Sequence, residues 1–386
     1  MLVVGSLIVS VAAQALSLPL VLSTFGSVSL LNPFVNLVAI LLTGLVVPLG
    51  FLSGVVGLVA LPLSRLINIV TNGLTGLLIQ VAEWGAALPS LPWGEIEPLG
   101  YLYYAVGVTA LVLVVRGLLR PWRGLLVLSV AILCSMLSAP SERPPEIVYL
   151  DVGQGDSALI RLPGRVEILV DGGGTPFSDF DIGARTVVPA LRALGVDELE
   201  LVIATHADTD HMEGLVSVLE QMPVQQLVVG IPNPDNPLYT RLQATAEARN
   251  VPIVPVLRGQ SLSIGAARLD ILHPANRSFE DENENSVAFV LNYQNVPKAL
   301  FLGDLSTEIE KSLAFPNLDI VMAGHHGSRY SSSPELIAAT TPAYAIFSYG
   351  RNNYGHPNRE VVARFEAAGA TIYETFRHGA VRLPLD

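Results

Sequence analysis

The pattern of apolar and polar positions changes near residue 140. Residues 1–139 consist of long apolar runs with only seven charged side chains. A helix that crosses a bilayer needs about 20 apolar residues, and several of these runs approach or exceed that length. The predicted helices are Leu2–Leu22, Asn36–Leu63, Leu66–Ala87, Leu99–Val115 and Gly124–Leu137. The first part of the chain is therefore predicted to be a polytopic α-helical membrane region.

The positive side chains predict how this region is oriented. Arg116, Arg120 and Arg123 crowd the short connection between the last two predicted helices. The preceding loop, Pro89–Pro98, contains acidic residues and no Lys or Arg. Short loops rich in Lys and Arg stay in the cytoplasm, so we expect the Arg-rich connection there. The chain after Leu137 is then expected to be extracytoplasmic.

Amide side chains interrupt the apolar runs, and two interpretations stay open. They either line a polar path through the membrane or bond neighbouring helices and interfaces. The residues concerned are Gln14, Asn32, Asn36, Asn68, Asn72 and Gln80.

Residues 146–386 show short apolar runs separated by Gly, Asp and Asn, which is typical of strands. The predicted strands are Glu146–Leu150, Ser157–Arg161, Glu167–Val170, Leu199–Thr205, Gln226–Gly230, Arg268–Leu272, Val287–Tyr293, Ala299–Leu302, Ile320–Ala323 and Tyr344–Ser348. The predicted helices between them are Ala184–Leu194, Leu215–Gln221, Pro237–Ala248, Ser306–Leu313, Pro334–Thr340 and Arg359–Ala368. Strands alternating with helices indicate a layered α/β domain, joined to the membrane region by a linker at residues 140–145.

The net charge and the cysteine count exclude few classes of function. The net charge is −12, which argues against a broad basic surface for nucleic acid. A nucleic-acid substrate is still compatible with this charge, because bound divalent ions supply local positive charge. The single cysteine, Cys134, lies in an apolar run and cannot form an internal disulfide.

The densest group of potential metal ligands follows the apolar run Leu199–Ala204. Within the next seven residues, Thr205–His211, stand two histidines and two aspartates. Alternate side chains share a face at the end of a strand, so His206, Asp208 and Asp210 can converge, and His211 turns in at the start of a helix. Two imidazoles and two carboxylates can divide between two divalent ions.

Three other apolar runs end in the same kinds of side chain. Asp171 follows Ile168–Val170, Asp304 follows a run that ends at Gly303, and His325 with His326 follows Ile320–Gly324. Each has a plain alternative, such as a turn aspartate or a capping histidine. Four strand ends that deliver His or Asp to one edge together predict a metal site.

These motifs carry a resemblance to a known family. The second half resembles the metallo-β-lactamase fold, an αββα sandwich, although Asp208 stands where the usual H-x-H-x-D-H signature has its second histidine. The combined motifs resemble ComEC-type competence proteins, which pass one strand of transforming DNA across a membrane. The motifs that carry this resemblance are Asp151–Ser157, His206–His211, Leu302–Asp304, His325–Ser328 and Tyr354–Pro357. That family begins with further helices and an OB-like domain, so we expect residues 1–139 to be a channel domain truncated at its N-terminus.

The resemblance also implies a set of metal ligands for two divalent ions, Mn²⁺ or Zn²⁺. His206 and Asp208 would hold one ion, Asp210 and His211 the other, and Asp304 would bridge them. His325 would complete the second site. The third histidine of the first site has no clear counterpart; His273 and the pair Asn285–Ser286 are candidates.

The remaining site predictions concern catalysis and substrate. Asp210, His356 and Asp171 are predicted to be catalytic: Asp171 would orient an imidazole, and His356 would protonate the leaving oxygen, bind phosphate or be a plain loop histidine. Substrate contacts are predicted for Gln154, Asp156, His326 and Ser328. The alternative for Gln154 and Asp156 is that they form a β-turn, and the alternative for Ser328 is that it lies in a solvated loop.

The resemblance implies a role in DNA uptake: a channel component in the inner (cytoplasmic) membrane whose extracytoplasmic nuclease domain degrades the strand that is not transported. Its expected partners are DNA, membrane lipid and other DNA-uptake proteins, with a homo-oligomer left open. Two alternatives compete with this hypothesis. One is a membrane-anchored metallo-hydrolase of small esters or phosphoesters, and the other is a channel with a non-catalytic DNA-binding domain.

Overall fold

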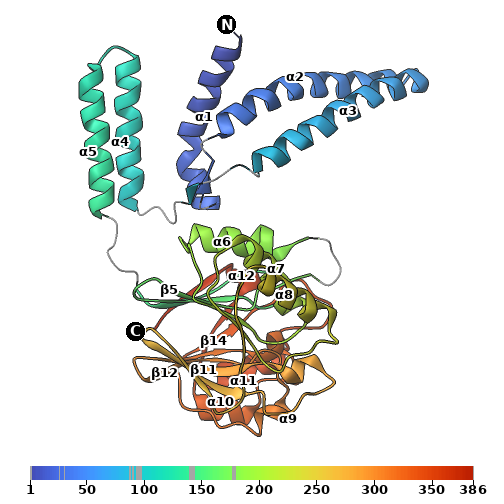
Figure 1. Ribbon diagram of the computed structural model, residues 1–386, viewed down its shortest axis with the longest axis vertical. Coiled ribbons are helices and arrows are strands. Elements are labelled where there is room, and N and C mark those ends of the chain that lie inside the picture. The colour runs from blue at the N-terminus through green and yellow to red at the C-terminus, as the bar shows by residue number, and fades with distance from the viewer. Residues whose placement is uncertain are drawn as a thin grey trace. The chain divides into compact units, whose positions relative to one another are not determined.

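The computed structural model describes residues 2–25, 27–29, 31–86, 88, 91–92, 98–138, 144–175 and 180–385 (Figure 1). The chain divides into two compact units. One comprises Met1–Ala139 with the short segment Arg192–Gly195, and the other comprises Pro140–Leu191 and Val196–Asp386. Each unit is described by itself.

The first unit is helical. Its helices are α1 (Leu2–Phe25), α2 (Asn32–Gly57), α3 (Leu61–Ala86), α4 (Pro98–Val115) and α5 (Pro121–Ser138). Helices α2 and α3 pack against each other, as do α4 and α5 (Figure 1). A short antiparallel pair, β1 (Ser27–Val28) with β2 (Leu91–Pro92), joins distant parts of the unit.

One predicted helix has the wrong boundaries. The run Asn36–Leu63 was expected to be one helix, but α2 begins at Asn32 and ends at Gly57, and α3 begins at Leu61. Pro62 occupies the first turn of α3, where its missing N–H costs nothing. Pro48 lies inside α2 and does not end it. The apolar pattern continues through residues 58–60 and so conceals the turn.

Two helices of this unit, α2 and α3, are long and apolar enough to cross a membrane. Helices α4 and α5 have 18 residues each, about 27 Å at 1.5 Å per residue. Large apolar side chains cover the outside of the unit; Phe51 is 77% exposed and Val115 is 79% exposed. Soluble proteins rarely expose contiguous apolar surface on this scale, which is consistent with a membrane region.

Several polar side chains of these helices form hydrogen bonds within the unit. Ser53 and Ser64 exchange hydrogen bonds between α2 and α3, with 2.9 Å between their hydroxyl oxygens. Gln14 donates to the Ser29 carbonyl at 3.0 Å, and Asn36 donates to the Ser10 hydroxyl at 3.3 Å. For Gln14 and Asn36 these bonds favour the helix-packing interpretation.

The second unit contains two seven-stranded sheets. The first has the order β16-β3-β4-β5-β6-β7-β8 and the second the order β15-β14-β13-β12-β11-β10-β9. Strands of the first sheet are β16 (Val381–Pro384), β3 (Glu146–Tyr149), β4 (Ala158–Leu162), β5 (Val166–Val170), β6 (Leu201–Ala204), β7 (Leu227–Val229) and β8 (Ile253–Pro255). Strands of the second are β9 (Ser261–Ile264), β10 (Ala267–His273), β11 (Ala288–Tyr293), β12 (Val296–Phe301), β13 (Ile320–Met322), β14 (Tyr344–Phe347) and β15 (Thr371–Glu374).

Helices lie outside the two sheets. Figure 1 shows α7 and α8 outside one sheet and α9, α10 and α11 on the side of the other. The helical segments are η1 (Gly183–Val187), α6 (Val188–Ala193), α7 (Thr209–Gln221), α8 (Pro237–Ala248), η2 (Glu282–Asn285), α9 (Thr307–Glu310), η3 (Gly324–Gly327), α10 (Pro334–Thr340), α11 (Arg359–Ala367) and α12 (Thr375–His378). The predicted αββα sandwich is confirmed.

The main core lies between the two sheets. It gathers apolar side chains of both, including Tyr149, Phe289 and Phe301. Phe289 and Phe301 stack with 4.8 Å between ring centroids, and Tyr149 lies 6.2 Å from Phe301. Burying such rings contributes about 1.5–3 kcal/mol each, and this packing fixes the sheets that carry the site.

In this unit, four strands were not predicted from the sequence pattern, and they are the four edge strands of its two sheets: β8, β9, β15 and β16. Edge strands have one neighbour and an open side, so they are short and few of their residues are fully buried. In β9, for example, exposed and half-buried residues alternate and none is fully buried. The central strands, buried on both faces, give the continuous apolar runs from which they were predicted.

Candidate metal centre

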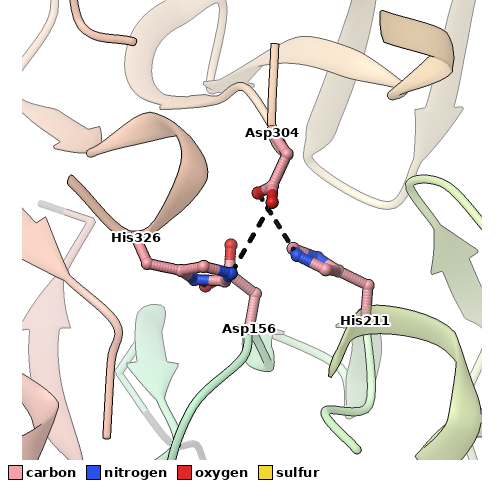
Figure 2. A group of neighbouring side chains, drawn as sticks. All are labelled: Asp156, His211, Asp304 and His326. Carbon is pink, nitrogen blue, oxygen red and sulfur yellow. Dashed lines mark hydrogen bonds and ion pairs between the residues drawn. The ribbon is translucent and has the colours of Figure 1, made fainter. Parts of the chain in front are cut away.

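Four strand ends bring polar side chains together. Asp171 follows β5, Thr205 and His206 follow β6, Asp304 follows β12, and the histidines of η3 follow β13. Helix α7 begins at Thr209 and therefore starts within the His206–His211 motif, earlier than the predicted Leu215. Figure 2 shows Asp156, His211, Asp304 and His326 pointing toward one another.

These four residues form a buried group. One ligand atom from each lies within 4.8 Å of the others. Asp304 lies between the two imidazoles, with its oxygens 3.2 Å from His211 Nε2 and 3.6 Å from His326 Nε2. Asp210 joins the group through Oδ2, which lies 3.3 Å from His326 Nε2. The bridging position implied for Asp304 is therefore geometrically available.

The imidazoles are held by their Nδ1 atoms, which leaves each Nε2 facing the centre. His326 Nδ1 lies 3.0 Å from the Ser348 carbonyl oxygen and 3.0 Å from Asp156 Oδ1. Because a carbonyl only accepts, Nδ1 of His326 carries the proton. His211 Nδ1 lies 2.9 Å from Asp171 Oδ2 in the same way.

A single carboxylate orients two histidines. Asp171 accepts the Thr205 N–H at 2.8 Å and the Thr205 hydroxyl at 2.7 Å. Since that hydroxyl donates to Asp171, its oxygen accepts from His206 Nδ1, which lies 3.0 Å away. Asp171 therefore sets the tautomer of His211 directly and that of His206 through Thr205. This is the position expected of a residue that orients ligands.

The facing atoms lack hydrogen-bond partners. Four buried atoms at the centre accept or donate no hydrogen bond among the described residues: Nε2 of His206, His211 and His326, and Oδ1 of Asp304. Buried polar groups are normally paired, so an unpaired cluster calls for an explanation. Imidazole nitrogens and carboxylate oxygens are ligands for zinc and manganese. The residues present therefore fit a divalent metal centre.

Charge within the group shifts the pKa of its members. Burial, the largest single effect, would lower the pKa of His211 and His326, but Asp304 and the other carboxylates around each ring together outweigh it, so both pKa values are raised. Burial and His211 lower the pKa of His206 to about 3. Burial and the charge of Asp210 raise the pKa of Asp208 to about 6. Perturbed groups of this kind concentrate at functional sites.

Strained backbone holds several of these side chains. Asp171, His325 and His326 have φ of 57°, 49° and 54°, in the left-handed region that non-glycine residues rarely adopt. Such residues cost about 1–3 kcal/mol each and cluster at functional sites. Gly327 follows with φ of 81°, and a Cβ there would lie 2.6 Å from the Phe347 ring.

The structure separates the two adjacent histidines. His326 is buried in the group, whereas the His325 side chain is 30% exposed, with Nε2 3.6 Å from Asp304 Oδ2. Asp156 and His326 were predicted as substrate contacts, and they lie among the candidate ligands. Asp208 lies at the edge, with its side chain 45% exposed and Oδ2 3.8 Å from His206 Nε2. Which of these residues bind metal stays a prediction.

The candidates for a further ligand have other partners. His273 Nε2 lies 2.9 Å from the Glu284 carbonyl oxygen, and Asn285 bonds the backbone of Phe279. The Ser286 hydroxyl accepts the Asp304 N–H at 3.0 Å and so helps to position that aspartate. No signal in the sequence pointed to this contact or to the relay through Thr205.

The predicted substrate and proton-transfer residues lie around the group. Gln154 Oε1 accepts the Gly350 N–H at 3.4 Å, and Ser328 is buried with its hydroxyl accepting the Tyr330 N–H at 3.3 Å. The His356 ring lies 5.3 Å from that of His325. Burial and the charge of His325 lower the pKa of His356 to about 4.

A tight turn ties the Asp156 segment to helix α7. The Asp156 N–H donates to the Asp210 carbonyl at 3.1 Å. Gly155, with φ of 132°, lies so close to this carbonyl that a Cβ would sit 2.2 Å from its oxygen. Only glycine permits this approach.

Comparison with known proteins agrees with this architecture. The two sheets and the site at their strand ends define a domain of the metallo-β-lactamase fold, and a family model described as a beta-lactamase superfamily domain matches residues 167–333. A second model, described as a competence protein, matches residues 1–118.

Two curated relatives match along nearly the whole chain. ComE operon protein 3 of Bacillus subtilis is 27% identical over 97% of this chain and 51% of its own length. Competence protein ComA of Neisseria gonorrhoeae is 31% identical, with the same shares covered. The resemblance to ComEC-type competence proteins is therefore confirmed along nearly the whole chain. The chain spans about half the length of these relatives.

Among solved structures, the metallo-beta-lactamase fold protein YhfI from Bacillus subtilis is 12% identical to this chain. Its match has a TM-score of 0.42 and covers 62% of this chain and 99% of that protein. A likeness at this level carries no argument about function.

Proposed function

We propose that the chain acts in DNA uptake at a membrane and that its C-terminal unit is a metal-dependent phosphodiesterase that cleaves DNA. The observation that carries the proposal is the buried cluster of His206, His211, His326 and Asp304 atoms without hydrogen-bond partners. The competence-protein match and the names of the relatives supply the DNA context. A domain that only bound DNA would gain nothing from this cluster.

The reaction proposed is hydrolysis of a phosphodiester. Two bound divalent ions, Mn²⁺ or Zn²⁺, would lower the pKa of a water and offset the charge of the phosphate. His206 with Asp208, and His211 with Asp210, would hold them, and Asp304 would lie between. Because Nδ1 of His206 and His211 is already bonded, each Nε2 is preorganised toward the centre.

The remaining steps fall to residues at the rim. His356 lies beside His325, and its buried Nδ1 has no hydrogen-bond partner among the residues that the structure describes. Because its pKa is lowered to about 4, His356 is neutral near pH 7, and we assign to it the other predicted role, a hydrogen bond from its ring N–H to a phosphate oxygen. Asp210, whose Oδ2 lies 3.3 Å from His326 Nε2, is placed to orient the attacking water. Neither role needs movement of the strands that carry the site.

The membrane arrangement forms part of the proposal. The Arg-rich connection between α4 and α5 favours a cytoplasmic position for that loop, and the phosphodiesterase unit would then face the outside of the inner membrane. DNA would be degraded on one strand while the other enters. Lipid, other DNA-uptake proteins and a second copy of the chain are the expected partners.

The test is a cleavage assay on the full chain in detergent. Labelled single- and double-stranded DNA would be incubated with Mn²⁺, Zn²⁺ or EDTA, using the wild type and the Asp208→Ala/Asp210→Ala double variant. We expect cleavage by the wild type alone, abolished by EDTA. If DNA stays intact with every metal while a small phosphodiester is hydrolysed, the small-ester alternative replaces the nuclease. If neither substrate reacts, the domain is a binding module.

A further inference from the structure

The loop from Gly350 to Asn358 is built rigidly beside the metal centre. The Asn352 side chain alone makes five hydrogen bonds within it. Its amide nitrogen donates to the Gly350 and His356 carbonyls at 3.0 and 2.8 Å. Its oxygen accepts the N–H groups of Tyr354, Gly355 and His356, each at 3.1 Å. One side chain thus fixes the path of the whole loop.

Both ends of the loop are anchored to the site. The Gly350 N–H donates to Gln154, and a Cβ on Gly350 would lie 2.4 Å from the Gln154 nitrogen, so the two backbones are in close contact. At the other end the Asn358 N–H donates at 2.8 Å to the carbonyl of Gly327, the residue after His326. The loop therefore holds a fixed position relative to the centre.

The loop extends a row of rings from the buried group to solvent. His211 and His326 lie 5.1 Å apart between centroids, His326 and His356 6.3 Å, and His356 and Tyr354 5.9 Å. Tyr354 ends the row and is 61% exposed. A large ring that a rigid loop holds in solvent keeps its face open to contact a ligand.

The turn that follows His325 and His326 also exposes an aromatic ring. Tyr330 is 65% exposed, and the Arg329 guanidinium carbon lies 5.4 Å from its ring centroid. Its backbone is fixed by the Thr307 N–H, which donates to the Tyr330 carbonyl at 2.7 Å. Arg351 is exposed at the start of the Asn352 loop. Exposed rings interleaved with arginines are the features with which proteins hold single-stranded nucleic acid.

We propose that the loop presented by Asn352 is a nucleobase-stacking subsite, in which Tyr354 stacks on a base of a single-stranded nucleic acid whose phosphate lies at the metal centre. This rests on the proposed phosphodiesterase function and adds the substrate class. In a duplex the faces of the bases are covered by their neighbours, so a stacking ring beside the cleavage site selects unpaired strands. Because every base offers such a face, the subsite tolerates any sequence.

The test measures binding separately from cleavage. The full chain in detergent would be titrated with Mn²⁺ present against a fluorescent oligothymidine with a phosphorothioate backbone, and affinity read by anisotropy. A second probe has the same backbone and abasic positions in place of the bases. The variants are Tyr354→Ala and Tyr354→Phe, and Asn352→Ala tests the loop that positions the ring. Thermal unfolding of each variant shows whether it is folded.

We expect Tyr354→Ala to weaken binding of the thymidine probe by about 5- to 150-fold, and Tyr354→Phe to bind like the wild type because the ring is kept. Asn352→Ala should fall between them. The abasic probe should bind wild type and Tyr354→Ala equally. Equal binding of both probes by the wild type, unchanged affinity in folded Tyr354→Ala, or no binding at all would overturn the inference. Absence of cleavage with base-dependent binding intact would refute only the proposed enzyme.

Discussion

The contact between Asp171 and two histidines gives the sharpest test of the metal centre. In Asp171→Asn the shape of the side chain is retained and the charge is lost. The amide nitrogen of an asparagine cannot accept, so wherever it faces His211 Nδ1 it must donate to it. That places the imidazole proton on Nε2, the atom that faces the centre. His211 would then present a proton where a ligand lone pair is needed.

The size of the effect follows from the contacts. Loss of a partner that orients a metal-binding histidine weakens metal affinity by about 10- to 100-fold, or about 1.4–2.7 kcal/mol. Asp171 is 1% exposed, so water cannot replace it. Thr205→Val removes only the hydroxyl that links Asp171 to His206 and leaves the 2.9 Å contact with His211 intact. Its effect should therefore be smaller and confined to the ion held by His206.

The assay is competition for Mn²⁺ or Zn²⁺ between the full chain in detergent and a chromogenic chelator, which gives both affinity and stoichiometry. Asp197→Asn is the matched control, because that aspartate is 59% exposed and its Oδ2 lies 3.4 Å from the exposed Arg165 guanidinium. We expect metal affinity to be highest in the wild type and in Asp197→Asn, lower in Thr205→Val and lowest in Asp171→Asn. Wild-type affinity in Asp171→Asn, with the variant folded, would refute the orientation argument.

Three further predictions concern stability and the framework of the site. Mn²⁺ at 100 times its Kd should stabilise the C-terminal unit by about 2.7 kcal/mol in thermal unfolding, and Asp304→Ala should abolish the gain; an equal gain in both would contradict a site at this residue. Arg161→Ala should cost about 3–5 kcal/mol in urea unfolding, because Arg161 is buried between two carboxylates at 3.1 and 3.4 Å, whereas half-exposed Arg382→Ala should cost under about 1 kcal/mol. Equal losses would refute that reasoning. Gly214→Ala, whose Cβ would lie 2.0 Å from a facing backbone carbonyl, should displace the start of α7 and weaken metal binding, while Gly76→Ala, with open space around it, should not; unchanged affinity in the first variant would contradict the role of this close packing.

Much of the architecture was present in local sequence. The apolar runs of residues 1–139 predicted helices, because a helix without a polar face needs an apolar environment. The central strands were predicted because burial on both faces leaves continuous apolar runs. The Thr205–His211 motif predicted a metal centre, because the ligand types and their spacing are set within one strand end and one helix start. These features depend on neighbours in the chain.

The tertiary structure decided what depends on distant residues. His325 and His326 are adjacent, and only the packing of η3 turned His326 toward the group, where it meets Asp156, 170 positions away in the chain. The relay from Asp171 through Thr205 to His206 joins two strands that are neighbours only in the sheet. The four edge strands of the C-terminal unit have one neighbour each and only three or four residues, of which at most two are fully buried, so their local pattern was too short to predict them. The sequence by itself determined which chemistry is available; the tertiary structure decided which atoms meet, because hydrogen bonds and metal coordination act over about 3 Å and only packing brings distant residues that close.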